Sequence, residues 1–391
     1  VERSRGLGDV YKRQTQGTPL EAEKNPHSLI GPYLSGKESL KVRSRATEKD
    51  MFENGSIRIK TKPFYTVQAL DVSIPKGRMI AVTGVSGSGK TSLAIECLVP
   101  ALQAVIQGTK LPEHVDSIEA KGIQSVKVID SKPIGANVRS TVATYDGVFD
   151  DLRKLFARTA DAKAKGLTAG DFSYNTGKLR CPVCDGTGII TMDVQFLPDV
   201  DTICPSCGGS RYGKDAYDIL WKSKEKDSVS VSLPGLLKLT VEEAAGILHE
   251  ETKIAKQLKI LQDFGVCYLT LGEATPALSG GEAQRLKLAY EMETPQQGSV
   301  FVFDEPTIGL HPQDVKKLVL IFDHLIQLGA TVIVIEHDLE LVTNCDYIID
   351  MGPWGGTEGG RVVVEGTPEA VAATSESITG RYLKQELAED K

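Results

Sequence analysis

The stretch that decides the fold is RMIAVT at residues 78–83, followed by GVSGSGKT at residues 84–91. The first segment is a short apolar run that predicts a buried strand, and the second fits the GxxxxGK[ST] pattern in full. Residues 91–104 have the length and spacing of a helix. Strand, loop and helix therefore follow one another in the order that a phosphate-binding loop requires.

This loop predicts a site for ATP and Mg²⁺. Backbone amides of such a loop wrap the phosphates, and the N-terminus of the following helix adds positive potential. Lys90 should reach the β- and γ-phosphates, and the Thr91 hydroxyl should hold Mg²⁺. A glycine turn with an incidental Lys-Thr pair is the alternative, which the complete pattern disfavours. The expected nucleotide-binding residues of the loop are Gly84, Val85, Ser86, Gly87, Ser88, Gly89, Lys90, Thr91 and Ser92.

Two more apolar strands are predicted, and each leads into polar residues. Residues 299–303 are followed by Asp304 and Glu305, and residues 331–335 are followed one position later by His337. Continuous apolar strands are typical of a parallel sheet covered on both faces. We expect Asp304 to help hold Mg²⁺, Glu305 to act as general base toward the attacking water, and His337 to contact the γ-phosphate. The predicted catalytic residues are Lys90, Glu305 and His337.

A second anion site is expected where the sequence LSGGEAQR begins at Leu278. Ser279, Gly280 and Gly281 open a helix there, so their backbone amides lack partners within the helix and can meet a phosphate. Glu282 directly follows these residues and is included in the nucleotide-binding set.

Four of the seven cysteines form two CxxC pairs, Cys181 with Cys184 and Cys204 with Cys207, with nineteen residues between the pairs. Each pair can present two thiolates from one tight turn, and four sulfurs satisfy tetrahedral Zn²⁺. No coordination position remains open, so the expected zinc site is structural. A redox pair or an iron–sulfur cluster is the less favoured alternative. The other cysteines, Cys97, Cys267 and Cys345, are expected to be buried thiols.

Composition limits the partners. The chain has 391 residues, 41% hydrophobic and 25% charged, with a formal net charge of −7. It contains no apolar run of the roughly 18 residues that a membrane helix needs, and its first residues do not read as a signal peptide. We therefore expect a cytoplasmic protein without a membrane partner. The negative charge gives no global attraction to nucleic acid, so any DNA contact must come from a local surface.

A short repeat indicates how the chain is organised. Gly17-Thr-Pro19 is followed by Ser28, Gly31, Tyr33 and Leu34, and Gly366-Thr-Pro368 is followed at identical offsets by Ser377, Gly380, Tyr382 and Leu383. The second copy ends an ATPase unit, so the first copy is expected to end a preceding unit. The chain is thus interpreted as the second half of a tandem duplication.

The predicted divisions follow from this reading. Residues 1–14 resemble translated adapter sequence and are excluded from the fold, residues 15–37 are the remnant of a first ATPase unit, and residues 38–55 form a linker. Residues 56–130 are the first part of an ATPase core, residues 131–245 an inserted domain with the cysteine module at 181–207, and residues 246–391 the second part of the core.

The motifs GVSGSGKTS, LSGGEAQRLKLA, FDEPTIGLHP and IEHDLELV occur in this order and resemble those of ABC-type ATPases. With the cysteine module, PIG at 133–135, RS at 139–140, ATY at 143–145 and FLPDV at 196–200, the chain resembles the C-terminal half of the UvrA family over residues 17–385. These proteins are the damage-recognition subunits of the bacterial excinuclease ABC. The implied fold is α/β: a P-loop ABC-type ATPase domain with an inserted, mainly helical signature domain that carries a four-cysteine zinc module.

The resemblance also implies a function. The family binds damaged double-stranded DNA across its inserted signature domains, dimerises, and binds UvrB through its first half. In ABC-type ATPases the signature of one unit completes the ATP site of another. A chain with one unit is then expected to hydrolyse ATP poorly unless it pairs. The implied role is an ATP-hydrolysing subunit for recognising DNA damage in nucleotide excision repair, without a nuclease site of its own.

The DNA-contacting residues are less clearly indicated. Residues 150–215 contain nine Lys and Arg against nine Asp and Glu, so no basic patch stands out. The candidates for phosphate contacts flank the cysteine pairs: Lys178, Arg180, Arg211 and Lys214. A solvated charged rim is the equal alternative.

One departure from the family pattern leaves other functions open. ABC-type ATPases carry a glutamine at the position of Ser131, and serine is too short to span the same gap to Mg²⁺ and water. A UvrA-like ATPase for drug resistance or another accessory role is therefore an alternative. A transporter motor is disfavoured because Ser279 lies 189 positions after Lys90, and this interval carries the zinc ligands. A non-hydrolysing scaffold is disfavoured by Asp304, Glu305 and His337.

Overall fold

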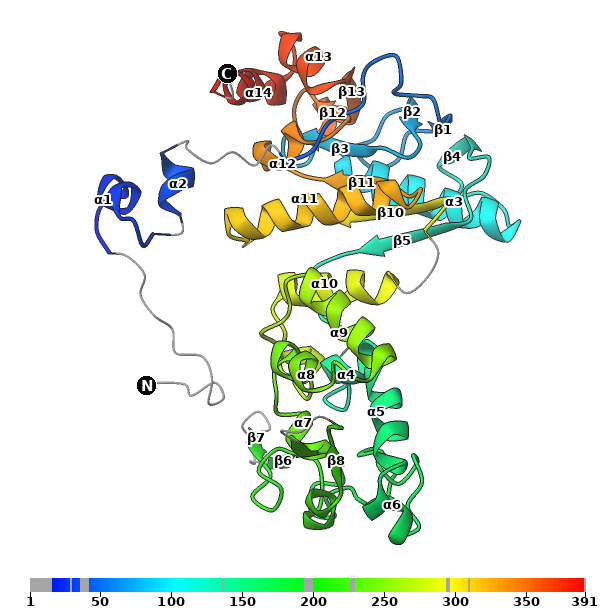
Figure 1. Ribbon diagram of the computed structural model, residues 1–391. Helices are drawn as coiled ribbons and strands as arrows, with labels where there is room; N and C mark the ends of the chain where they lie inside the picture. Colours follow the sequence, from blue (N-terminus) through cyan, green and yellow to red (C-terminus); the bar gives the residue numbers. More distant parts are fainter. Residues whose placement is uncertain are drawn as a thin grey trace. The chain divides into compact units, whose positions relative to one another are not determined.

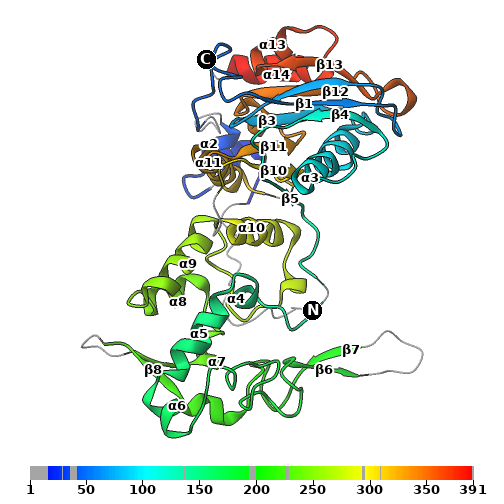
Figure 2. The same ribbon diagram turned by 90° about the vertical axis from the view of Figure 1, so that its right-hand side faces the viewer.

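The computed structural model describes residues 16–28, 30–35, 42–135, 137–192, 200–224, 229–292, 296–308 and 310–389. The chain forms two compact units (Figures 1 and 2). The core unit comprises the residues up to Val128 and those from Gln297 onward, and the inserted unit comprises Ile129–Gln296. The predicted adapter segment 1–14 and most of the FLPDV motif lie outside the described residues.

A six-stranded sheet forms the centre of the core unit, in the order β13-β12-β3-β11-β10-β5. Strands β12, β3, β11 and β10 pair in parallel, and β13 runs antiparallel to β12. Every residue of β3, β11 and β12 is buried, which confirms the predicted covered sheet. The strands are β3 (Met79–Gly84), β5 (Ser125–Ile129), β10 (Ser299–Asp304), β11 (Thr331–Ile335), β12 (Tyr347–Gly352) and β13 (Arg361–Gly366).

The strand order brings the motifs together. Because β3 lies between β11 and β12, and β10 lies next to β11, the carboxyl ends of four parallel strands share one edge of the sheet. The loops at this edge include the phosphate-binding loop and carry Asp304, Glu305 and His337, whereas the predicted anion site at Ser279 lies in the inserted unit. Ligands of parallel α/β sheets bind at this edge because the loops there are free to carry polar groups.

Helices flank the sheet and are amphipathic. The longest, α11 (Pro312–Gln327), begins with a proline at N1 after the His311 cap and buries Val315, Leu318, Phe322 and Leu325 at intervals of three and four residues. This spacing places one apolar stripe against the sheet, and burying a side chain such as Phe322 contributes about 2–3 kcal/mol. Figure 1 shows α11 running alongside β10 and β11.

The helix predicted after the phosphate-binding loop is confirmed, and its first part is π-helical. Residues Ser92–Leu98 form a π-helical segment, η1, which continues as α3 (Val99–Gln107). Its buried face joins a hydrophobic cluster with a small antiparallel sheet in the order β2-β1-β4. The strands of this sheet are β1 (Ser56–Thr61), β2 (Asp71–Pro75) and β4 (Val115–Glu119).

The two copies of the repeat have the same local structure. The first copy forms α1 (Pro19–Lys24) and α2 (Gly31–Leu34), and the second forms α13 (Pro368–Ala373) and α14 (Ile378–Glu389). The Ser28 hydroxyl accepts the Gly31 amide at 3.1 Å, and the Ser377 hydroxyl accepts the Gly380 amide at 2.7 Å. A Cβ atom at either glycine would collide with a carbonyl oxygen of the preceding helix. The repeated residues therefore serve the same turn.

The inserted unit is mainly helical, as predicted, with two short hairpins, β6 with β7 and β8 with β9. It extends to Gln296, whereas the sequence placed the end of the insert at 245, so the signature helix α10 belongs to this unit. Its helices are α4 (Val142–Tyr145), α5 (Val148–Ala157), α6 (Ala160–Ala164), α7 (Leu233–Leu236), α8 (Val241–Ile247), α9 (Thr252–Asp263) and α10 (Gly280–Glu291). Its strands are β6 (Ile189–Met192), β7 (Val200–Ile203), β8 (Leu220–Lys222) and β9 (Ser230–Ser232).

Within the described ranges, every helix is too short or too polar to cross a membrane.

Candidate functional site

The loop after β3 has the geometry of a phosphate cradle. Gly84, Gly87 and Gly89 have φ values of +126°, +76° and +97°, which residues with a Cβ rarely adopt. At Gly84 there is also no room, since a Cβ atom would lie 2.0 Å from the Met351 carbonyl oxygen. The Ser88 hydroxyl is buried, and among the described residues it has no hydrogen-bond partner. An unpaired buried hydroxyl in a glycine-rich loop that precedes a helix fits a bound phosphate.

Lys90 lies within this loop. Its ammonium donates to the carbonyl oxygens of Gly84 and Val85, each at 2.9 Å, and the residue is buried. Burial lowers the pKa of Lys90, and the carboxylates of Glu305, Asp350 and Asp304 oppose that shift. The lysine is therefore a cation held at the loop and surrounded by acidic groups, which suits the binding of an anionic ligand together with a divalent cation.

A second glycine-rich loop, residues 353–360, packs against the phosphate-binding loop and donates hydrogen bonds to its carbonyls. The Gly356 amide donates to the Gly87 carbonyl at 3.1 Å, and the Gly360 amide donates to the Ser88 carbonyl at 3.0 Å. The contact is so close that a Cβ atom at Gly355 would lie 2.5 Å from the Ser86 carbonyl oxygen. We did not predict this support from the sequence, although the run GPWGGTEGG offered a signal in its density of glycines.

The predicted general base, Glu305, and the histidine predicted to contact the γ-phosphate, His337, lie together. The Nε2 atom of His337 is 3.3 Å from the Oε1 atom of Glu305, and both side chains are partly exposed. Glu305 has φ +48°, and its amide donates to the Ile335 carbonyl at 2.9 Å. A left-handed non-glycine residue costs about 1–3 kcal/mol, and such strain clusters at functional sites. Asp304 directly precedes it at the end of β10, while Thr91 is exposed at the start of η1.

Glu336 was missed by the sequence analysis. It is buried and accepts hydrogen bonds from the loops that follow both β10 and β11. The available signal was an acidic residue directly after an apolar strand and directly before the predicted histidine.

The signature helix α10 has a fully formed cap. The Ser279 hydroxyl donates to Glu282 at 2.8 Å, and the Ser279 amide donates to the same carboxylate at 2.7 Å. Tyr268 donates to the other Glu282 oxygen at 3.0 Å. Burial raises the pKa of Glu282, but the hydrogen bonds from Ser279 and Tyr268 outweigh burial and hold it below its usual value. A phosphate at this helix N-terminus would compete with Glu282 for Ser279, whereas Gly280 and Gly281 offer their amides.

The residues after β5 contact the signature helix. A Cβ atom at Gly280 would lie 3.1 Å from the Ser131 carbonyl oxygen, and Lys287 of α10 forms an ion pair with Asp130 at 2.6 Å. Ser131, at the position where a glutamine was expected, therefore packs closely against the start of α10.

The four paired cysteines form one cluster. Their sulfur atoms all lie within 4.8 Å of one another, with 4.0 Å between Cys181 and Cys204 and 3.7 Å between Cys184 and Cys207. These distances are too long for disulfides, in which the sulfurs are about 2 Å apart. Tetrahedral Zn²⁺ with bonds of about 2.3 Å requires sulfurs about 3.8 Å apart. The donor set and its spacing both fit a closed zinc site.

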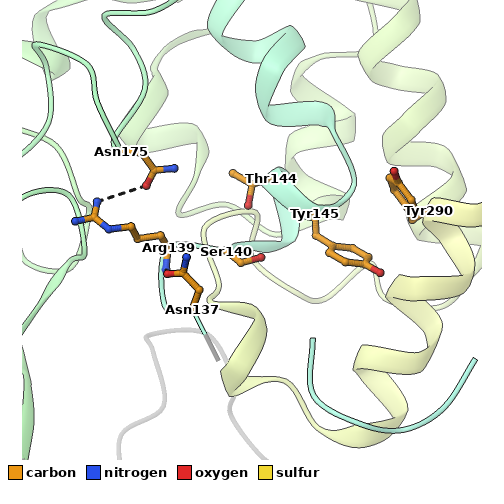
Figure 3. Close-up of a pocket in the computed structure, with 7 residues that line it drawn as sticks. All are labelled: Asn137, Arg139, Ser140, Thr144, Tyr145, Asn175 and Tyr290. Carbon is orange, nitrogen blue, oxygen red and sulfur yellow. Dashed lines mark hydrogen bonds between the residues drawn. The ribbon is translucent and has the colours of Figure 1, made fainter. Parts of the chain in front are cut away.

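Residues of the cysteine module form hydrogen bonds with residues 138–140, which in turn bond to a residue close to the signature. Arg139 donates to the Asp185 carbonyl at 2.8 Å, and Arg211 donates to the Val138 carbonyl at 2.8 Å. The Thr275 amide, close to the signature, donates to the Ser140 carbonyl at 2.9 Å. A cavity of about 450 Å³ opens beside this segment (Figure 3). It is lined by Asn137, Arg139, Ser140, Thr144, Tyr145, Asn175 and Tyr290.

The four candidate DNA contacts have different environments. Lys178 and Lys214 are exposed, and Arg180 is partly exposed and pairs with Asp185 at 3.0 Å. Arg211 is 6% exposed, and its guanidinium lies 5.1 Å from the centre of the Tyr174 ring. Burial lowers its pKa. Arg211 therefore supports the module from within and does not present its charge to solvent.

No protein-family model matches the chain. It is 42% identical over 383 residues to UvrABC system protein A from Staphylococcus aureus (strain COL), and this match covers 96% of the chain and 39% of that protein. UvrABC system protein A from Bacillus subtilis (strain 168) is 41% identical over 378 residues, covering 96% of the chain and 38% of that protein. The crystal structure of UvrA2 from Deinococcus radiodurans matches with a TM-score of 0.86 and 37% identity, covering 96% of the chain and 44% of that structure.

Proposed function

We propose that this chain, whose resemblance to the UvrA family extends over nearly its whole length, is an ATP-hydrolysing part of a subunit that recognises DNA damage in nucleotide excision repair. The chain spans about two fifths of the length of the curated relatives it matches. The observation that carries the proposal is the pairing of His337 with Glu305 at the sheet edge that also holds Lys90 and Asp304. We assign the protein to the cytoplasm.

Hydrolysis follows from the positions of these side chains. Mg²⁺, held by Thr91 and Asp304, would neutralise charge on the β- and γ-phosphates when bound. When the nucleotide binds, the Lys90 ammonium would give up its hydrogen bonds to the loop carbonyls and donate to phosphate oxygens instead. Glu305 accepts a proton from the attacking water. The water oxygen bonds to the γ-phosphorus while the bond between the γ-phosphorus and the bridging oxygen of ADP breaks. His337, already beside Glu305, holds the γ-phosphate in line.

A complete ATP site requires two units. The helix N-terminus at Ser279, Gly280 and Gly281 of one copy would meet the γ-phosphate bound by the loop of another, so the active form of this chain is a self-dimer. Glu282 must then release the Ser279 hydroxyl, and this exchange links ATP binding to the cap of α10. The ion pair between Asp130 and Lys287 lies next to this cap and would respond to the same change.

The inserted unit is the proposed DNA-binding element, with Zn²⁺ as a structural ion held by the four cysteines. Lys178, Arg180 and Lys214 are the candidates for contacts to phosphates of damaged double-stranded DNA. Arg211 is not among them, because it is buried and its guanidinium donates to the Val138 carbonyl. The UvrB partner is assigned to sequence outside this chain.

The test compares a duplex that contains one bulky lesion with the same undamaged duplex, at fixed salt, with Mg²⁺ and ATP. The chain is measured alone and within a protein that includes the preceding sequence. Tighter binding of the lesion duplex is expected for the larger protein. Equal affinity for the two duplexes would refute damage recognition and favour the accessory ATPase, for which the serine at position 131 is the supporting feature.

A further inference from the structure

Glu336 joins the two loops that carry the predicted catalytic pair. The loop after β10 contains Glu305 and Thr307, and the loop after β11 contains His337. The backbones of these loops also meet directly, since the Glu305 amide donates to the Ile335 carbonyl at 2.9 Å.

The Glu336 carboxylate divides its oxygens between the loops. Its Oε1 atom accepts the amide of Thr307 at 2.9 Å and also the Thr307 hydroxyl. Its Oε2 atom accepts the amides of His337 at 2.6 Å and Asp338 at 3.0 Å. The residue is 2% exposed, so protein donors and not water meet this carboxylate.

An ionised carboxylate suits this position because it accepts on both oxygens and donates on neither. Four donors converge on it, and hydrogen bonds to a charged acceptor are about twice as strong as neutral ones. With both oxygens occupied by protein donors, Glu336 is not suited to act on the nucleotide. Its bonds instead fix the backbone on each side of the pair formed by Glu305 and His337.

We propose that Glu336 is a positioning residue for ATP hydrolysis, which holds His337 in register with the loop that carries Glu305. The inference rests on the proposed ATPase function of this sheet edge. It gives a role to the residue directly before His337, and it predicts an effect on turnover and not on ATP affinity.

Glu336→Gln is a sharp test because the side chain keeps its size. One oxygen becomes an NH₂ group, which then faces the donors of one loop, so that loop loses its acceptor. Thr307→Val removes a single hydroxyl donor, and Thr307→Ser keeps it. Glu376→Gln is the matched control, because Glu376 is exposed and its hydrogen-bonded side-chain partner is Ser375.

The experiment measures Mg²⁺-dependent ATP hydrolysis by the whole chain, with ATP affinity measured separately by equilibrium dialysis. For Glu336→Gln we expect kcat to fall about 10- to 100-fold, as the loss of a charge-assisted hydrogen bond implies, with ATP affinity within about twofold of the parent. Thr307→Val should lower kcat by a smaller factor, and Thr307→Ser and Glu376→Gln should match the parent.

Parental kcat in Glu336→Gln would overturn the inference. So would an equal loss of ATP affinity and thermal stability that accounts for the lost turnover, because this would indicate a purely structural role. If Glu336→Gln does not fold, the kcat values of Thr307→Val and Thr307→Ser test the inference instead. Equal kcat values for these two variants would overturn it. A parent chain without any hydrolysis refutes the ATPase proposal itself. An active parent that is silenced by Glu305→Gln but unaffected by Glu336→Gln refutes the positioning role alone.

Discussion

Replacing Cys181 by serine removes one of the four thiolates of the proposed zinc site. Cys181 is fully buried, and the apolar cluster at this place consists of Cys181, Cys184 and Cys204 with Ile190 and Cys207 packed against them. So small a cluster buries too little apolar surface to hold two turns together without the metal. Structural zinc sites contribute about 10–16 kcal/mol in small metal-dependent domains.

A neutral serine hydroxyl is a poor replacement for a soft thiolate, so most of that free energy should be lost with Cys181→Ser. We expect the zinc content to fall from about one ion per chain to a small fraction of that after dialysis against a weak chelator. The loss should also expose residues 181–192 and 200–212 to proteolysis. If the module unfolds, the hydrogen bond from Arg139 to the Asp185 carbonyl is lost. The segment before α4 should therefore become accessible to protease as well.

The assay is metal analysis by mass spectrometry, combined with limited proteolysis at native pH. Cys267→Ser is the matched control, because it makes the same chemical change at a cysteine outside the cluster. The prediction that Cys267 is buried is wrong, since it is partly exposed, whereas Cys97 and Cys345 are buried. Unchanged zinc stoichiometry in Cys181→Ser would refute the site. Equal loss of zinc from both variants would show that the effect is not specific to the cluster.

Three further predictions concern other parts of the chain. Gly84→Ala should lower the melting temperature by several degrees and abolish ATP binding, because its Cβ atom would lie 2.0 Å from a carbonyl oxygen. Arg211→Ala should destabilise the chain in urea, whereas Lys178→Ala should leave stability unchanged and weaken DNA binding with a reduced salt dependence. Burial raises the pKa of Asp130, but Lys287 outweighs it and the net pKa is lowered, so the stabilisation is present at neutral pH and lost as the pH falls below 3.8. Asp130→Asn should therefore lower the urea midpoint more at pH 7 than at pH 3.

Much of the core unit could be predicted because its chemistry is local in the sequence. A glycine-rich loop after an apolar run needs the backbone angles found at Gly84 and Gly87, and these angles restrict the residue type directly. The cysteine pairs are similar, since two tight turns bring the four sulfurs together once the turns meet. The repeated residues around Ser28 and Ser377 also produced matching turns.

Other features depend on contacts between distant residues. Arg211 looked like a surface cation next to a cysteine pair, but the ring of Tyr174 and the carbonyl of Val138 cover it. Glu336 looked like part of the histidine motif, and its role becomes visible only where the loop containing Thr307 reaches it. A residue's neighbours across the fold, and not its neighbours in sequence, decide these cases.

The division between the units is a third such feature. From the sequence, residues 246–296 are predicted to belong to the ATPase core. In the structure these residues pack with α5 and with the segment after β5, and they complete the inserted unit. The order of the ATPase motifs along the chain therefore does not reveal where one packed unit ends and the next begins.

The most direct test of the central claim is phosphate release from Mg²⁺-ATP by the parent chain and by Glu305→Gln, with ATP binding measured in parallel. The parent's rate per chain should rise with protein concentration, because two units complete each site. Glu305→Gln should bind ATP normally and hydrolyse it about 100-fold or more slowly. Equal rates of phosphate release from the two proteins would contradict the claim that this sheet edge is a hydrolytic ATP site.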